Sequence, residues 1–206
     1  MSEARQSGEL NGEFAGAPTG EVAAMVAVQA ALADRPGVLT VARAMSHFGE
    51  HSIGWLALSL LGAVLQPRRR REWALAGAGT FAAHAAAVLI KRVVRRPRPH
   101  HPAVAVNVGT PSRLSFPSAH ATSTTAAAIL LGRAAGLPAG LAAAVLVPPM
   151  ALSRIVLGVH YPSDVAAGVA VGAGVAALTT RVGRALDTDS RCPGFSTPGF
   201  SNRGPR

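Results

Sequence analysis

Three basic side chains in this sequence are suited to binding a phosphate group. Lys91 and Arg98 bracket a stretch that Pro97 and Pro99 restrict, and Arg154 follows an apolar run later in the chain. A lysine presents a compact positive charge, and an arginine presents a planar fork that matches two phosphate oxygens. These residues predict a phosphate site, although basic residues that simply end a membrane span have the same pattern.

His160 and Asp164 have the spacing of a nucleophile and its partner. Four residues apart, they would share one face of a helix, although Pro162 between them predicts a turn followed by a new helix. In either geometry Asp164 can accept the proton of the imidazole Nδ1, which leaves Nε2 free to attack phosphorus. The alternative is a structural His–Asp pair that caps the last helix.

The segment Pro117-Ser118-Ala119-His120 comes directly before an apolar run and predicts the start of a helix. Free backbone N–H groups at a helix N-terminus bind anions, and the hydroxyl of Ser118 adds another donor. His120 could then give a proton to a leaving oxygen. Taken alone, the segment also fits an ordinary helix cap with an interfacial histidine.

The composition predicts that these groups stand on a membrane protein. Of the 206 residues, 49% are hydrophobic and 15% are charged, and the net charge of +10 lies in arginine blocks between apolar runs. This pattern indicates loops at membrane interfaces and argues against a nucleic-acid groove. The expected fold is all-α, a polytopic membrane helix bundle with five to six spans. We expect spans at 52–66 (extended back to about 40), 73–90, 119–135, 139–152 and 165–180.

Outside these spans the sequence predicts little ordered structure. Residues 21–33 are apolar but short, which predicts either an interfacial helix or a partial first span. We expect residues 1–20 and 186–206 to be disordered tails around one membrane-embedded domain at 21–185. The first twenty residues lack the basic region and cleavage site of a secretory signal peptide.

Alternating crossings of these spans would bring the phosphate and histidine clusters to one membrane face. The other face would receive the block Arg68–Arg71 with Arg133, Arg181 and Arg184. Each face then carries seven cations, so a simple positive-inside count is a tie. If Lys91, Arg98 and Arg154 are reserved for a ligand, the balance favours an extracytoplasmic site in a bacterial plasma membrane.

Acidic and metal-binding residues are scarce around the predicted site. Between Glu72 and Asp187 the only carboxylate is Asp164, whereas a magnesium or two-metal phosphohydrolase needs several oxygen ligands. We therefore expect catalysis without a metal or other cofactor. The segment His47-Phe48-Gly49-Glu50-His51 has the H-x-x-E-H pattern of some zinc enzymes but lacks a plausible third ligand. We therefore interpret this segment as interfacial polar residues at the start of the first span, which could lie near the substrate headgroup. His84 is expected to be buried and hydrogen-bonded.

The three clusters together resemble the phosphatidic acid phosphatase type 2 superfamily. Its pattern of Lys-x6-Arg-Pro, Pro-Ser-Gly-His and Ser-Arg-x5-His-x3-Asp matches 91–99, 117–120 and 153–164, except that Ala119 stands where glycine is usual. The resemblance implies that His160 forms a phosphohistidine, that Asp164 orients it, and that His120 is the general acid and base. It implies a phosphate cradle made of Lys91, Arg98, Ser118, Ala119 and Arg154, with no metal.

The expected function is therefore that of an integral-membrane lipid phosphate phosphatase. Within the family, the compact size and the Ser46–His51 segment are similar to a branch that acts on decaprenylphosphoryl-5-phosphoribose in cell-wall arabinan synthesis. Phosphatidic acid, phosphatidylglycerol phosphate and undecaprenyl diphosphate stay open as substrates. A phosphotransferase and a non-catalytic protein that binds anionic lipids are the other readings. We expect no nucleic-acid partner and no obligate protein partner.

Overall fold

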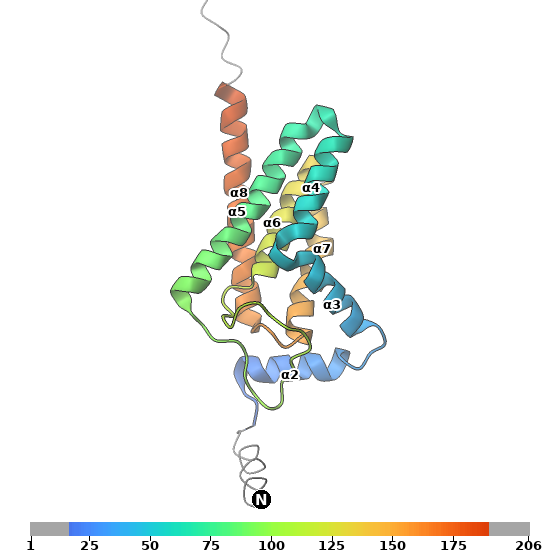
Figure 1. Cartoon of the computed structure of the whole chain (residues 1–206), viewed down its shortest axis with the longest axis vertical. Coiled ribbons are helices and arrows are strands. Elements are labelled where there is room, and N and C mark those ends of the chain that lie inside the picture. The colour runs from blue at the N-terminus through green and yellow to red at the C-terminus, as the bar shows by residue number, and fades with distance from the viewer. Residues whose placement is uncertain (1–16, 190–206) are drawn as a thin grey trace, which may run out of the picture.

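The computed structural model describes residues 17–189, and the regular elements among them are helices. Figure 1 shows a bundle of roughly upright helices with a long loop at its lower end. The elements are α2 (Gly20–Leu32), α3 (Val38–Gly49), η1 (Glu50–Ser52), α4 (Ile53–Leu65), η2 (Pro67–Arg69), α5 (Arg70–Val94), α6 (Ala119–Ala134), α7 (Leu141–Val156) and α8 (Pro162–Asp189). The predicted all-α class is confirmed, and a lone antiparallel bridge joins Pro97 to Leu114 in the loop.

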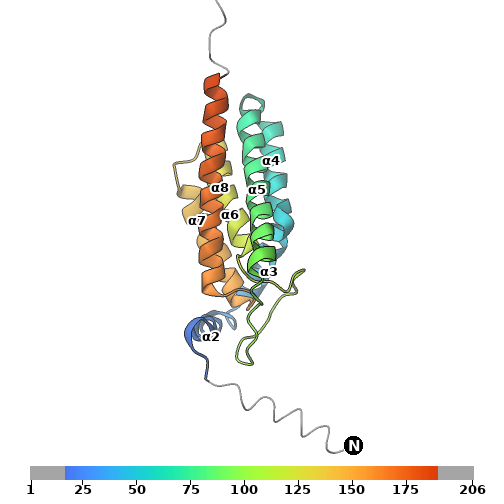
Figure 2. The ribbon, with the colours of Figure 1, turned by 90° about the vertical axis from the view of Figure 1, so that its left-hand side faces the viewer.

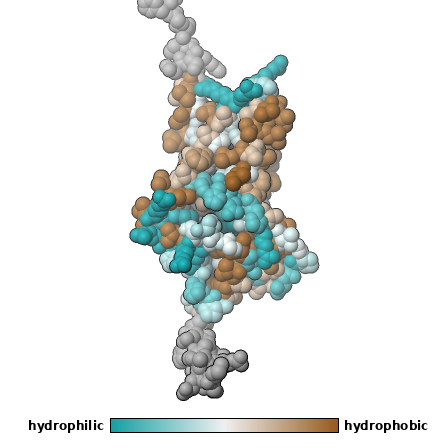
Figure 3. All heavy atoms as spheres, viewed as in Figure 1, coloured by the Kyte–Doolittle hydropathy of each residue, from teal (hydrophilic) through white to brown (hydrophobic). Residues whose placement is uncertain are grey.

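Three of the described helical segments are long and apolar enough to cross a membrane. They are Val38–Leu65, which combines α3 and α4, then Pro67–Val94 and Pro162–Leu186. Their outer surfaces carry large apolar side chains, including Leu60, Leu65 and Leu178, each more than 60% exposed. Figure 3 shows apolar surface between polar residues at the top of the bundle and a larger polar region over its lower half. This distribution is that of a membrane protein.

The central helix α6 carries small and hydroxylated residues because it is surrounded by α5, α7 and α8. The hydroxyls of Thr122 and Thr125 are buried and donate to the carbonyls of Ser118 and Ala121, 2.9 and 2.8 Å away, so their burial leaves no polar atom unpaired. Figure 2 shows α5, α6 and α8 running side by side. This arrangement holds the start of α6 in the middle of the lower end of the bundle.

Close contact between α6 and α8 depends on glycine. A Cβ added at Gly168 would lie 2.6 Å from the carbonyl oxygen of Ser118, and one at Gly172 would collide with the carbonyl of Thr122. Small residues at helix interfaces let two backbones approach in this way. As a result the amide of Ser118, at the start of α6, donates to the carbonyl of Asp164 in the first turn of α8, 2.9 Å away. Packing of these helices thus joins two of the sequence motifs.

Helix α2 lies across the lower end of the bundle and not along it (Figures 1 and 2). This orientation, across the candidate spans, is the one that the interfacial alternative for residues 21–33 predicts. Its buried Gln29 donates to the carbonyls of Ala105 and Val156 at 2.7 and 3.0 Å and accepts from the amide of Ala105. These bonds fix α2 against the long loop and the end of α7.

Two helix boundaries differ from the expected ones. Helix α8 continues to Asp189, past the boundary at 185, and the rest of the predicted C-terminal tail lies outside the described residues, as do residues 1–16 of the N-terminal one. Helices α6 and α7 have 16 residues each, fewer than the roughly 20 that a span usually needs. The number of five to six spans therefore stays a prediction.

Candidate active site

The three sequence clusters meet around one cavity of about 490 Å³ at the lower end of the bundle. Six of the eight predicted site residues line it: Lys91, Arg98, Ala119, His120, Arg154 and His160. The other two, Ser118 and Asp164, are fully buried directly behind this wall. The end of α5, the long loop, the start of α6, the end of α7 and the turn before α8 therefore all contribute to the same site.

Backbone carbonyls hold Lys91 and Arg98 in place. The ammonium of Lys91, the only lysine in the chain, donates to the carbonyls of Leu114 and Ser115 at 3.2 and 2.9 Å. The guanidinium of Arg98 donates to the carbonyls of Ser112 and Val159 at 2.8 and 2.6 Å. Burial lowers the pKa of Arg98 to about 10, so it still carries its charge at neutral pH. Both cations are oriented before any ligand arrives.

Arg154 is the most deeply buried cation of the site, with 1% of its surface exposed. Its guanidinium donates to the hydroxyls of Ser153 and Ser46, both at 3.1 Å, and to the carbonyl of Ala42 at 3.4 Å. Each of these partners is neutral. A buried charge without a counterion is costly, and an anion in the cavity would supply the missing negative charge.

The contacts of His160 determine which of its nitrogens is free of a proton. Nη1 of Arg98 lies 3.2 Å from Nε2 of His160, and because an arginine can only donate, Nε2 must accept. The proton of the neutral ring is then on Nδ1, which lies 3.7 Å from Oδ2 of Asp164, slightly beyond hydrogen-bond distance. Burial, opposed by Asp164 and assisted by the charges of Arg98 and Lys91, lowers the pKa of His160 to about 4. The ring is therefore neutral at physiological pH, with Nε2 unprotonated.

The position of Asp164 depends on a residue that the sequence did not single out. Nη1 of Arg96 donates to Oδ1 of Asp164 at 2.9 Å, while the amide of Tyr161 donates to Oδ2 at 2.8 Å. Arg96 also stacks on the ring of Tyr161, 4.0 Å from its centre, and pairs with Glu21 of α2 at 2.7 Å. Glu21 in turn accepts from the amide of Ser163 at 2.8 Å. A chain of contacts thus runs from α2 through Arg96 to Asp164 and His160.

His120, in the first turn of α6, is held by a contact with the end of α3. Its Nε2 lies 2.9 Å from the carbonyl oxygen of Ser46, and since a carbonyl only accepts, Nε2 carries a proton. Nδ1 is the nitrogen left to exchange a proton with a ligand. Ser118 caps α6, the alternative role considered for it, because its hydroxyl accepts from the amide of Ala121 at 3.4 Å. Its own side chain is therefore directed to the helix backbone.

The remaining histidines divide into two groups. His47, His51 and His84 line the cavity, whereas His100 and His101 do not. The expectation for His84 was wrong in one respect, because its buried Nδ1 has no hydrogen-bond partner among the described residues. Within residues 17–189 no three His, Cys, Asp or Glu side chains are placed to share a metal ion.

Comparisons with known proteins agree with the motifs. Residues 71–187 match the PAP2 superfamily. The chain is 74% identical over 167 residues to proteins from two strains of Mycobacterium tuberculosis named decaprenylphosphoryl-5-phosphoribose phosphatase, covering 81% of this chain and 93% of theirs. A protein of the same name from Mycolicibacterium smegmatis is 72% identical over 152 residues, covering 74% of this chain and 83% of the relative. No solved structure matches significantly. The chain belongs to the PAP2 superfamily.

Proposed function

We propose that this protein is a membrane-embedded lipid phosphatase whose substrate is decaprenylphosphoryl-5-phosphoribose. The observation that carries the proposal is one cavity lined by three oriented cations, Lys91, Arg98 and Arg154, and by His160, whose unprotonated Nε2 lies 3.2 Å from Arg98. Relatives with 72–74% identity carry the name of that phosphatase. Apolar helices around the site would keep the lipid tail in the bilayer while the phosphate enters from the interface.

In the first step, Nε2 of His160 attacks phosphorus in line with the ester oxygen. The new P–N bond forms as the bond between phosphorus and the ester oxygen on the 5-carbon of the ribose breaks, giving a phosphohistidine. The cations of the cradle, with the amide of Ala119 at the start of α6, stabilise the charge on the three equatorial oxygens. Asp164, held by Arg96, stabilises the positive charge that His160 acquires.

His120 handles the proton in both steps. Because Nε2 of His120 donates to the carbonyl of Ser46, His120 acts from its doubly protonated form: Nδ1 would deliver the second proton to the leaving ribose oxygen, which leaves the ring neutral. In the second step the same nitrogen takes a proton from a water molecule, whose oxygen attacks phosphorus. The P–N bond then breaks, inorganic phosphate leaves, and His160 returns to its neutral form.

We further propose a multi-pass protein of the bacterial plasma membrane with the cavity on the extracytoplasmic side. Lys91, Arg98 and Arg154 belong to the site and are therefore left out of the positive-inside count, which then favours a cytoplasmic position for the end that carries Arg68–Arg71. Cys192, the only cysteine, follows α8 in sequence. An impermeant maleimide should therefore leave Cys192 unlabelled in intact cells and label it after lysis; labelling of intact cells would reverse the orientation.

A phosphate-release assay on the purified protein in detergent tests the activity. We expect release from decaprenylphosphoryl-5-phosphoribose in the presence of EDTA, faster than from phosphatidic acid, phosphatidylglycerol phosphate or undecaprenyl diphosphate. Lipid binding without phosphate release from any of the four would instead support a non-catalytic protein. Faster release from another of the four lipids would overturn the substrate but keep the phosphatase.

A further inference from the structure

The cavity has a second wall that the phosphate chemistry does not use. His47 from the end of α3, Glu50 and His51 from η1, and His84 from α5 line it together with the phosphate cradle. At about 490 Å³ the cavity has the size of a site for a whole headgroup, far larger than a phosphate group needs. The question is which part of a substrate this wall contacts.

The backbone of this wall is strained. His51 and Ser52 lie between two helices of one membrane segment, and both have left-handed backbone conformations, with φ of 50° and 63°. Residues other than glycine rarely adopt this conformation, and where it persists it tends to mark functional sites. The break ends α3 and restarts the helix as α4, so that Glu50 and His51 reach the cavity and do not continue along the lipid-facing helix.

This wall is also in direct contact with the proposed catalytic acid. A Cβ added at Gly49 would lie 2.8 Å from Cδ2 of His120, so only a glycine lets the end of α3 pack so closely on that ring. The carbonyl of Ser46, one turn earlier, accepts from the same histidine. A group bound by Glu50 and His51 would therefore lie next to the leaving oxygen that His120 protonates.

The charges of the wall favour hydroxyl groups. Among the described residues, Glu50 is the one carboxylate that lines the cavity, whereas its other charged lining residues are cations. A carboxylate repels phosphate oxygens but accepts strong hydrogen bonds from hydroxyls. Imidazoles can donate or accept, and the rings of His51 and His84 lie 6.1 Å apart, with the buried Nδ1 of His84 unpartnered. A carboxylate and two imidazoles therefore match vicinal hydroxyls, which also donate and accept hydrogen bonds.

We propose that Glu50, with His51 and His84, binds the hydroxyls of the sugar ring that carries the scissile phosphate, and that Glu50 determines specificity for a sugar-phosphate lipid. This inference rests on the proposed function and names the part of the site that selects the substrate. The ribose of decaprenylphosphoryl-5-phosphoribose has two free ring hydroxyls. The headgroups of phosphatidic acid and undecaprenyl diphosphate have none. A site built to bind hydroxyls discriminates strongly against analogues that lack them.

The test compares two substrates in two variants. Glu50→Ala should lower kcat/KM for the ribose lipid by about 10- to 100-fold, because it loses the hydroxyl contacts, and should change kcat/KM for phosphatidic acid by less than about twofold. Glu72→Ala, which removes an exposed carboxylate at the opposite end of the bundle, is the matched control and should leave both values unchanged. An equal loss on both lipids, or no loss on either, would overturn the proposal.

An inhibition experiment gives an independent reading. Against the wild-type protein, ribose 5-phosphate should compete about tenfold better than inorganic phosphate, and against Glu50→Ala the two should compete equally. An unchanged preference in Glu50→Ala would reject Glu50 as the sugar contact. A wild-type protein that releases no phosphate from the ribose lipid would instead reject the proposed function itself, which separates the two failures.

Discussion

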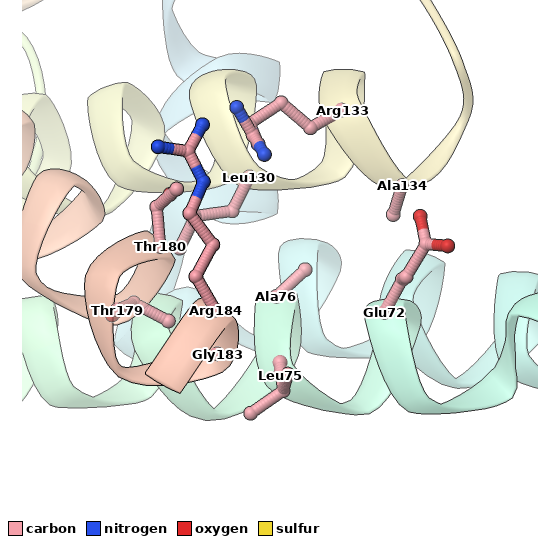
Figure 4. A pocket seen from close by; sticks show the side chains of 10 residues that line it. All are labelled: Glu72, Leu75, Ala76, Leu130, Arg133, Ala134, Thr179, Thr180, Gly183 and Arg184. Carbon is pink, nitrogen blue, oxygen red and sulfur yellow. The ribbon is translucent and has the colours of Figure 1, made fainter. Parts of the chain in front are cut away.

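Arginine is abundant at both ends of the helix bundle, but the burial and hydrogen bonding of these arginines differ between the two ends. At the motif end, Arg154 is almost fully buried, and Arg98 is held by two backbone carbonyls. At the other end, Arg133 and Arg184 are exposed around a smaller pocket between α5, α6 and α8, with Glu72 nearby (Figure 4). A solvated arginine gains little from a surface partner, whereas a buried and oriented one acts strongly on a bound anion. The burial and orientation of its arginines therefore distinguish the candidate active site from the opposite end of the bundle.

The largest effect should come from the nucleophile. His160→Ala removes the atom that accepts the phosphoryl group, so phosphate release should fall by about a thousandfold or more. Binding of the lipid should be retained, because the cations of the cradle remain. The two measurements are phosphate release and equilibrium binding of the labelled lipid. Phosphate release by His160→Ala at the wild-type rate would contradict the proposed chemistry.

Changing the shape of one oriented cation should have the next largest effect. Arg98→Lys keeps the charge but loses the fork that contacts Ser112, Val159 and His160, so kcat/KM should fall by about 100-fold. Arg133→Lys is the same change at the opposite end and should leave kcat/KM nearly unchanged. Equal losses in the two variants would remove the distinction between the ends.

Titration of the His160 ring by NMR tests its protonation state directly, whereas kcat/KM also follows the protonation of His120 and of the substrate. Because the pKa of His160 is lowered to about 4, its neutral form persists well below the usual pKa near 6.5. At pH 5 this retains about 30-fold more neutral imidazole than an ordinary histidine would have. The ring signals of His160, identified by their loss in His160→Ala, should therefore stay unshifted between pH 7 and about pH 5. A titration midpoint near pH 6.5 would contradict the lowered pKa.

Loss of the Arg96 contact should have a smaller effect, confined to kcat. In Arg96→Met, Asp164 loses its charged partner and the link to Glu21, so His160 is oriented less well and kcat should fall by about tenfold with KM unchanged. Arg96→Lys should recover part of the loss. The control is Arg95→Met, the same change at the adjacent exposed residue. A comparable loss of kcat in Arg95→Met would indicate a general effect on the loop and not a specific effect on Asp164.

The smallest effect is expected at the opposite end. Replacing both Arg133 and Arg184 by alanine removes the exposed cations shown in Figure 4 and should change kcat/KM by less than about twofold. The assay in detergent keeps membrane insertion out of the measurement. A loss comparable to that of Arg98→Lys would mean that this end also takes part in catalysis.

The sequence predicted the helices and the candidate site residues because both depend on local patterns. Apolar runs mark the helices, and Lys91, His120 and His160 lie within short motifs of fixed spacing. The contact between Glu21 and Arg96 could not be predicted, because it joins residues 75 positions apart and Arg96 lies among several arginines. The break at His51 and Ser52 was also missed, since neither position has the glycine that usually marks a left-handed backbone.

The most direct test of the account is to trap the covalent intermediate. The purified protein, quenched with alkali within its first turnover of lipid phosphate, should carry one acid-labile phosphoryl group on the peptide that contains His160, as read by mass spectrometry. The His160→Ala variant should carry none. Rapid phosphate release without an adduct, or an adduct on another residue such as His120, would contradict the central claim.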